Sequence, residues 1–287
     1  MICTLCPRLC GVDRRERIGF CGAGEDVVLA RAELHFWEEP YLAGGGASGA
    51  VFFSGCNLQC VFCQNAPISL RVKGERLGAK ELADVFRRLE DEGAENIDLI
   101  TPTPYVPMIK DALDIYRPAL PIIYNSGGYE RVETVRSLAG YIDVYLPDYK
   151  YYDDALALRY SRAPRYRECA EEAILEMRRQ VADEVADGVL RRGLAVRHLV
   201  LPTHAKDSLQ VLDRIYQLLG KDVHLSIMSQ YTPCGELTAF PELKRGVSPL
   251  EYKAVIAHAE RLGFENAFMQ EMSSATETFI PAFLRGE

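Results

Sequence analysis

Three cysteines in one short segment constrain this chain more than any other feature. Residues 54–65 read S-G-C-N-L-Q-C-V-F-C-Q-N, so Cys56, Cys60 and Cys63 follow a C-x3-C-x2-C spacing. The apolar run at residues 49–53 predicts a buried strand that ends in a tight turn just before them. Three thiols so close in sequence make a poor disulfide framework, so a metal is the expected partner.

The number of ligands carries the next inference. A closed structural zinc site takes four ligands, and iron–sulfur clusters are normally held by four cysteines. A four-iron cluster on this loop would therefore keep one iron free for an exogenous chelating group. Phe62, just before the last cysteine, is expected to pack beside that group. The alternative is a zinc site completed by Cys169 or Cys234.

A second cysteine group lies in residues 1–24. Its members are Cys3, Cys6, Cys10 and Cys21. This spacing is compatible with a tetrahedral thiolate site, and so short a segment cannot bury a core, so a metal would supply its folding energy. Structural zinc, a rubredoxin-like iron site and an auxiliary iron–sulfur cluster all suit four thiolates.

Length, charge and cysteine use bound the protein class. A chain of 287 residues with 48% hydrophobic residues can form one barrel-type domain with a full core. The net charge of −8 argues against a nucleic-acid partner. We also expect no membrane association, because no apolar run approaches about 18 residues and no signal sequence opens the chain. Cysteines grouped as ligands indicate a reducing cytoplasm.

Alternating strand and helix patterns follow the first cysteine loop. Strands are expected at residues 49–53, 97–101, 120–124, 141–146, 195–201 and 223–228. Helices are expected around residues 82–89, 106–113, 130–139, 167–185 and 209–219, the last with Leu209, Leu212, Tyr216 and Leu219 inward. A capping box at Ser248 and Glu251 opens a C-terminal helix that closes at Gly263. This order predicts an α/β fold with a parallel barrel or part of one.

The domain prediction places a four-cysteine extension and connector at residues 1–48 and the barrel with its C-terminal helix at 49–287. Within the connector, residues 27–39 predict one or two strands, and the glycine-rich stretch at 43–49 is read as a hinge. Polar side chains recur after the predicted strands, and in parallel barrels chemistry occurs at the carboxyl ends of strands. The stretches concerned are Cys56, residues 101–104, 125–128, 148–150, 202–204 and 229–231.

The first cysteine loop resembles the C-x3-C-x-aromatic-C motif of radical S-adenosylmethionine (radical SAM) enzymes. The resemblance implies that Cys56, Cys60 and Cys63 hold a 4Fe-4S cluster whose open iron binds the amino and carboxylate groups of S-adenosylmethionine (SAM). Reductive cleavage of SAM then yields a 5′-deoxyadenosyl radical that abstracts hydrogen from a substrate. The implied fold is a partial (β/α)6 TIM-type barrel with cluster and cofactor at its open top. No catalytic residue beyond cluster and cofactor is implied.

Within that family the chain is similar to the activating enzymes of glycyl-radical enzymes, the pyruvate formate-lyase activating enzyme subgroup. Asp148 and Lys150 match the D-x-K motif of that subgroup, whose residues lie at the cofactor. Arg197 matches an arginine on the fifth strand that reaches the cofactor carboxylate, and Asn125 is expected to hydrogen-bond the ribose or carboxylate. The resemblance further implies a glycyl-radical enzyme or peptide as substrate and an electron donor such as flavodoxin or ferredoxin.

Two departures separate the chain from that subgroup. The Gly-Gly-Glu motif that receives the cofactor amino group is absent, and Thr103 stands in its place within residues 101–104. The N-terminal cysteine group also differs from the ferredoxin-like insert of many activating enzymes. The chain is therefore expected to be an activase-like radical SAM oxidoreductase with an unassigned protein or small-molecule substrate. The alternative is a non-catalytic iron–sulfur or zinc protein, an electron carrier or scaffold. Cys234 is read as a loop thiol, with a radical relay as the alternative.

Overall fold

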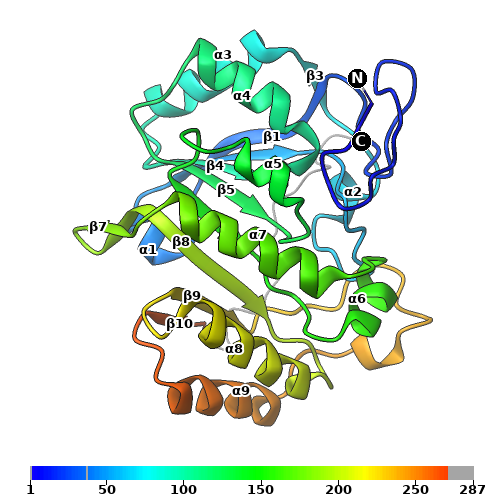
Figure 1. Cartoon of the computed structure of the whole chain (residues 1–287), viewed down its shortest axis with the longest axis vertical. Coiled ribbons are helices and arrows are strands. Elements are labelled where there is room, and N and C mark those ends of the chain that lie inside the picture. The colour runs from blue at the N-terminus through cyan, green and yellow to red at the C-terminus, as the bar shows by residue number, and fades with distance from the viewer. Residues whose placement is uncertain (1, 37, 271–287) are drawn as a thin grey trace.

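The computed structural model describes residues 2–36 and 38–270 as one curved sheet with helices on its outer side (Figure 1). The strand order is β10-β9-β8-β6-β5-β4-β2-β1-β3, and β7 pairs with β8 outside this path. From β2 to β10 every neighbouring pair on the path is parallel, whereas β1 runs antiparallel to both β2 and β3. The sheet therefore curls as an open, partial barrel whose edges are β10 and β3.

The strands on the path have the following bounds. They are β1 Val27–His35, β2 Ser48–Phe53, β3 Glu75–Leu77, β4 Ile97–Ile100, β5 Ile122–Ser126, β6 Val144–Pro147, β8 Val189–Leu199, β9 His224–Met228 and β10 Ala267–Met269. The short strand β7 covers Glu184–Ala186. All six residues of β2 and all four of β6 are buried, as expected for strands covered on both faces.

The helices connect successive strands and pack beside one another around the outside (Figure 1). Their bounds are α1 Pro40–Ala43, α2 Ala66–Ser69, α3 Ala79–Asp91, α4 Val106–Ile115, α5 Val132–Arg136, α6 Asp154–Ser161, α7 Tyr166–Gln180, α8 Ala205–Leu219 and α9 Pro249–Leu262. Among the described residues no helix is both long enough and apolar enough to cross a membrane.

The short helix α1 closes the amino end of the barrel. Leu42 is buried among inward side chains of β5, β6 and β8, including Ile123 and Ala195. The Asn96 side chain donates to the Leu42 carbonyl oxygen at 3.0 Å. In Figure 1, α1 lies at the left end of the parallel strands, whose arrowheads point to the right, toward α2, α6 and the N-terminal segment. The barrel is therefore plugged at one end, which leaves the carboxyl ends of the strands for a site.

The six predicted barrel strands are confirmed, with shifted bounds. β5 extends through Asn125 and Ser126, which the sequence had placed after the strand, and β6 begins only at Val144. β8 is longer than expected because it begins in a hairpin with β7. β10 and β3 were not anticipated. The connector strand at 27–35 is present and joins the barrel sheet. Trp37 and residues 271–287 lie outside the described residues, and the domain boundary at 48/49 stays a prediction.

Three helix predictions need correction. The helix expected over residues 167–185 ends at Gln180, because Asp187 and Gly188 both adopt positive φ and form the hairpin turn that pairs β7 with β8. The helix expected over residues 130–139 is confined to Val132–Arg136.

On α8, the buried residues are Asp207, Ser208, Val211, Leu212 and Ile215. Of the four residues predicted to face inward, only Leu212 is among them. Tyr216 instead packs edge-on against Phe264 beyond α9. The capping box of Ser248 and Glu251 and the closing Gly263 of α9 are as predicted.

Glu130 explains why α5 begins late. Its side chain is buried and bonded to Thr103 Oγ1 at 2.5 Å and to the Tyr124 hydroxyl at 3.3 Å, so this stretch is held against the sheet. Burial raises the pKa of Glu130 from 4.5 to about 7. The protonated carboxyl is thus the form that the fold accommodates.

The first prediction concerns Glu130→Gln, which imitates the protonated acid. In the wild type, the contribution of Glu130 to the free energy of unfolding is fully present below the pKa of Glu130 in the unfolded chain and is lost as pH rises through about 7. The variant has no carboxyl to ionise, so its free energy of unfolding should exceed that of the wild type at neutral pH by up to about 3 kcal/mol. Urea unfolding between about pH 5 and about pH 8 measures it. The exposed Glu133→Gln on α5 is the control; equal pH profiles for wild type and Glu130→Gln would contradict the prediction.

Candidate functional site

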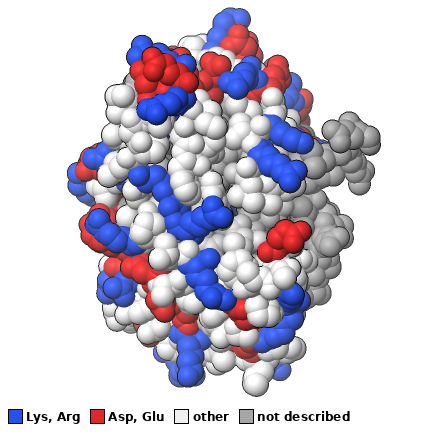
Figure 2. Space-filling model, turned by 90° about the vertical axis from the view of Figure 1, so that its right-hand side faces the viewer, with Lys and Arg blue, Asp and Glu red and all other residues white. Residues whose placement is uncertain are grey.

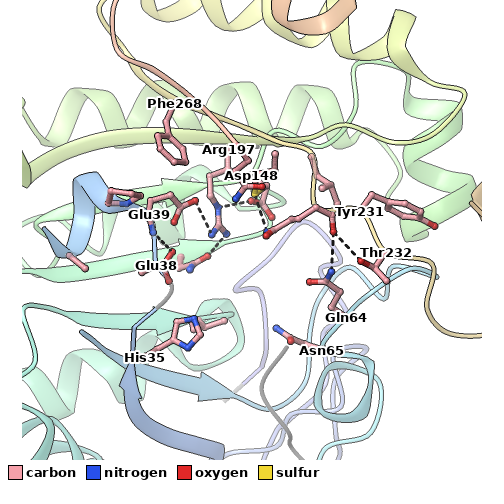
Figure 3. Close-up of a pocket in the computed structure, with 18 of the residues that line it drawn as sticks. His35, Glu38, Glu39, Gln64, Asn65, Asp148, Arg197, Tyr231, Thr232 and Phe268 are labelled. Atoms are coloured by element: carbon pink, nitrogen blue, oxygen red, sulfur yellow. Dashed lines mark hydrogen bonds and ion pairs between the residues drawn. The ribbon is translucent and has the colours of Figure 1, made fainter. Parts of the chain in front are cut away.

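A cavity of about 780 Å³ opens inside the barrel and along its open side. Its wall includes Cys60 and Cys63 from the cysteine loop, Arg197 from β8, His35 at the end of β1 and Phe268 from β10. Figure 3 shows Gln64, Asn65 and Tyr231 on one side of the Arg197–Asp148 pair and Glu38, Glu39 and His35 on the other. The cavity therefore runs from the cysteine loop past buried charges to the segment before α1.

The cysteine loop presents three sulfurs that each accept a hydrogen bond. The Leu58 amide donates to Cys56 Sγ at 3.4 Å, Ser161 Oγ to Cys60 Sγ at 2.9 Å and Ser69 Oγ to Cys63 Sγ at 3.3 Å. Burial raises the thiol pKa to about 12 at Cys56 and about 11 at Cys63. Thiolates at this site therefore need a cationic partner, and the donors suit thiolates bound to iron.

Charged side chains that are largely shielded from water continue the wall from the cysteines into the barrel. Lys150 Nζ lies 2.5 Å from Asp148 Oδ2, and Arg197 Nε lies 3.0 Å from Asp148 Oδ1. Arg197 Nη2 donates to Asn125 Oδ1 at 2.5 Å. Although burial opposes the charge, Lys150 and then Arg197 hold the pKa of Asp148 below its ordinary value. The four residues thus form one charged network across β5, β6 and β8.

Two acids that the sequence analysis did not place in the site extend this network. Glu39 is buried, and its Oε1 lies 3.9 Å from Arg197 Nη1, while Glu38 also lines the cavity. Burial raises the pKa of both carboxyls. Glu38 and Glu39 precede α1, so only the folded plug brings them to Arg197. The resemblance to the activating enzymes begins at this Glu-Glu-Pro stretch, but it assigned the two acids no role.

Most predicted cofactor-binding residues meet in this cavity. Phe62, Asn125, Asp148, Lys150 and Arg197 all line it. The Phe62 ring packs edge-on against Tyr231, with centroids 5.8 Å apart.

Thr103 does not join them. It is buried outside the cavity lining, and its hydroxyl donates to Glu130. A cofactor contact for Thr103 therefore finds no support in this structure, because the loop after β4 turns into α4. Cys234 lies beside the loop, with its Sγ 3.1 Å from the Phe62 carbonyl oxygen.

The N-terminal cysteines pack directly behind the cysteine loop. A Cβ at Gly55 would lie 2.5 Å from the Cys21 carbonyl oxygen, and Gln59 Nε2 donates to the Phe20 carbonyl at 3.0 Å. The Arg8 guanidinium donates to the Asn57 carbonyl at 2.8 Å. The Arg8 guanidinium interacts electrostatically with Cys6 of the N-terminal group and with Cys56 and Cys60 of the cysteine loop. The two cysteine groups are therefore neighbours.

The thiols of the N-terminal group also lie near one another. Cys10 hydrogen-bonds Cys3, and Cys21 interacts electrostatically with both. Within the described part of the chain, no three His, Cys, Asp or Glu side chains already stand as they would around a single metal ion.

The second prediction tests the contact between the two groups. Gly55 and Gly93 share a φ of +89°, but a Cβ at Gly93 would meet nothing within 4 Å. Both alanine variants strain the backbone by about 1 kcal/mol, whereas Gly55→Ala also collides with the Cys21 carbonyl. Gly55→Ala should lose about 1–3 kcal/mol more stability and part of its bound iron. Thermal unfolding and iron analysis measure both effects; equal losses in the two variants would contradict close packing.

Comparison with known proteins bears on the superfamily and the fold. Residues 50–192 match the profile of the Radical SAM superfamily. A curated relative, the uncharacterized protein MJ0674 of Methanocaldococcus jannaschii, is 27% identical over 275 residues, which is 92% of this chain and 75% of the relative.

Solved structures share the fold. Streptococcus suis SuiB bound to S-adenosylmethionine superposes with a TM-score of 0.53 at 14% identity, covering 77% of this chain and 50% of SuiB. SuiB bound to the precursor peptide SuiA superposes with a TM-score of 0.50 at 15% identity, covering 75% of this chain and 46% of SuiB. A spore photoproduct lyase mutant gives 0.50 at 11% identity, covering 83% of this chain and 79% of the lyase. The chain spans about half the length of SuiB. The chain therefore contains a Radical SAM superfamily domain.

Proposed function

We propose that this protein is a radical SAM enzyme that abstracts hydrogen from a protein or small-molecule substrate. The observation that carries the proposal is a loop of three cysteine sulfurs, each with a hydrogen-bond donor, of which Cys60 and Cys63 line one end of a cavity that Lys150 and Arg197 also line. When bound, a 4Fe-4S cluster and SAM, which the superfamily implies, would supply the reductive cleavage that makes a 5′-deoxyadenosyl radical. Cys56, Cys60 and Cys63 would hold the cluster.

The chain's own residues would bind and orient the cofactor. Lys150 interacts electrostatically with Cys60, so its ammonium lies near the sulfurs where the methionine end of SAM would dock. Arg197 donates through Nε to Asp148 and through Nη2 to Asn125. Its Nη1 lies 3.9 Å from Glu39 Oε1, which is beyond hydrogen-bond length. The Nη1 edge faces Glu39 and not the cysteines, so Arg197 would act on the cofactor carboxylate by its charge and through the Asp148 that it shares with Lys150. Phe62 and Tyr231, which also line the cavity, would exclude water from it.

An activase-like branch is the finer proposal. It is supported by the bridge between Asp148 and Arg197, which brings the D-x-K motif beside the arginine of the fifth barrel strand. The placement of Thr103 away from the cavity separates the chain from activases that carry Gly-Gly-Glu. The substrate would be a glycyl-radical enzyme, a peptide or a small molecule.

An electron donor of the flavodoxin or ferredoxin type is also proposed. Figure 2 views the molecule from the side to which the parallel strands point, and Lys and Arg side chains cross the centre of this face. Exposed cations close in sequence to the cysteine loop or to its partner Ser161 are Arg71, Lys73 and Arg162. An acidic carrier would be attracted to such a face although the chain is acidic overall. A cytoplasmic location belongs to the same proposal.

The N-terminal group is proposed to bind a second metal, either zinc or iron–sulfur. Burial raises the pKa of Cys6 to about 12 and also raises that of Cys21, so thiolates there need a cation as well. The metal would fix the segment that packs behind Gly55. Whether it also carries electrons depends on its identity.

The third prediction separates the two metal sites. Replacing Cys56, Cys60 and Cys63 with alanine should abolish 5′-deoxyadenosine formation from SAM under reduction by dithionite, because no open iron remains. The variant should keep the metal of the N-terminal group. Replacing Cys3, Cys6, Cys10 and Cys21 with serine should remove that metal and leave some uncoupled SAM cleavage.

Iron, sulfide and zinc analysis after anaerobic purification, with an assay for 5′-deoxyadenosine, measures these outcomes. Cleavage by the first variant would refute the assignment of the cluster ligands. A wild-type protein that contains a cluster but never cleaves SAM would be the non-catalytic electron carrier or scaffold. A metal content unchanged in the serine variant would refute the second site.

The fourth prediction concerns Arg197. Arg197→Lys keeps the charge but loses the planar donor pair, so SAM affinity of the cluster-loaded protein should fall about ten- to a hundredfold. Calorimetry, or the spectroscopic change of the cluster on binding, measures this affinity. Arg214→Lys, whose arginine pairs with Glu171 outside the cavity, is the control. An Arg197→Ala protein with an intact cluster and unchanged affinity would remove Arg197 from the cofactor site.

A further inference from the structure

The end of the cavity farthest from the cysteine loop is acidic. Contacts define an order along the wall, because Lys150 interacts with Cys60 and pairs with Asp148, Asp148 pairs with Arg197, and Arg197 faces Glu39. Figure 3 shows the same order, with Glu38 and Glu39 on the side of Arg197 away from Gln64 and Asn65. The acids are therefore separated from the cluster end by the Arg197–Asp148 pair.

Charge is unbalanced in this part of the barrel. Lys150 and Arg197 are the cations of the network, and both pair with Asp148. Glu38, Glu39 and Asp98 are three further carboxyls that interact with one another, and Arg197 is the cation that acts on all of them. Burial raises the pKa of all three carboxyls, so a bound cation would be needed to hold them ionised together.

Asp98 gives a second, independent sign of a missing partner. It is fully buried on β4, and its Oδ2 accepts from Asn125 Nδ2 at 3.1 Å. Its Oδ1 has no hydrogen-bond partner, although the carboxyl interacts with Glu38 and Glu39. A buried carboxylate oxygen without a donor is uncommon in folded proteins. The acidic end thus contains a buried carboxylate oxygen that no donor of the described chain satisfies.

We infer that Glu38 and Glu39, supported by Asp98, form a subsite for a cationic group of the substrate, a primary ammonium or a guanidinium. The inference rests on the proposed function, because it assigns the substrate end of the same cavity. The ligand cation would donate to the two glutamates, which line the cavity, and would balance the charge of the group that includes the buried Asp98 behind them. His35 and Phe268 flank the acids from β1 and β10, at the open side of the barrel through which a substrate can enter (Figure 3).

The ammonium of SAM itself fits this subsite poorly. It stands on the same carbon as the SAM carboxylate, and in the proposed function both groups bind at the open iron beside the cysteines. The acids lie beyond the Arg197–Asp148 pair, so one molecule would have to place the same amino group at both ends. A second molecule is the better occupant. Phe36, Phe268 and the Tyr41 ring near Phe268 add aromatic surface that favours a cation.

The test is binding to the full chain, loaded with cluster and SAM under anaerobic conditions. The probes are cadaverine and agmatine as cations and 1,5-pentanediol as a neutral molecule of similar length. Calorimetry should show that both cations bind at least about tenfold more tightly than the diol. The double variant Glu38→Gln/Glu39→Gln should lose this preference and retain SAM affinity within about twofold. Glu39→Asp should preserve part of the preference, which excludes a mere folding defect.

A matched control removes the same charge elsewhere. Glu25 and Asp26 are adjacent, exposed and outside the cavity lining, so Glu25→Gln/Asp26→Asn should bind both cations as the wild type does. Equal binding of diol and diamine, or no binding of either cation by the wild type, would overturn the inference. So would a double variant that loses SAM affinity and keeps the cation preference, since the acids would then serve the cofactor. Cation binding by a protein that never cleaves SAM would instead refute the proposed function and leave the subsite standing.

Discussion

The ion pair between Arg197 and Asp148 holds the interior of this barrel together. Asp148 is buried and Arg197 is largely so, and their backbones form a bridge beyond the paired residues of β6 and β8. An arginine largely removed from water needs acceptors around it, and here Asp148, Asn125 and Glu39 provide them. Strands β5, β6 and β8 are thereby fixed at one level. Removing Asp148 would take from both Lys150 and Arg197 their shared carboxylate, so the charge pattern of the cavity depends on this network.

The same network divides the cavity into two ends of different character. Toward the cysteine loop, Lys150 adds positive charge beside sulfurs that need a cationic metal to become thiolates. Toward α1, Glu38, Glu39 and Asp98 add acceptors in excess of the available cations. A ligand pair with a carboxylate at one end and a cation at the other would complete both. Burial makes these matches strong, because unpaired charge costs far more inside the barrel than in water.

The N-terminal segment acts on the site from outside the barrel. Arg8 donates to carbonyl oxygens of Asn57 and Leu58 in the cysteine loop, and its guanidinium lies over the Phe20 ring at 4.0 Å. Gly55 lets the Cys21 carbonyl approach the loop. A metal at the four N-terminal thiols would therefore stiffen the loop that carries Cys56. The loop is held from both sides, since Ser161 of α6 donates to Cys60 from the barrel.

The sequence by itself determined the local chemistry and most of the element order. The spacing of Cys56, Cys60 and Cys63, the alternation of strands and helices, and the capping box of α9 are local patterns, and local patterns survive in any fold of the chain. Asn125 could be found because strand ends of a parallel barrel meet at one face, whereas Asp148, Lys150 and Arg197 were marked by their resemblance to motifs of the activating enzymes. The sequence-based prediction was wrong where a local pattern is compatible with two structures. At residues 181–188 helical spacing predicted a longer helix, but the chain forms a hairpin with an Asp-Gly turn.

The tertiary structure alone decided which distant residues share the cavity. Thr103 follows a strand, as Asp148 and Lys150 do, but its hydroxyl donates to the buried Glu130 outside the cavity lining. Glu38 and Glu39 precede the first barrel strand in sequence and reach Arg197 only because α1 folds back to plug the amino end of the barrel. The two cysteine groups became neighbours through the packing of Cys21 on Gly55. Such contacts join segments far apart in the chain, and no periodicity or spacing records them; only the packing of the folded chain does.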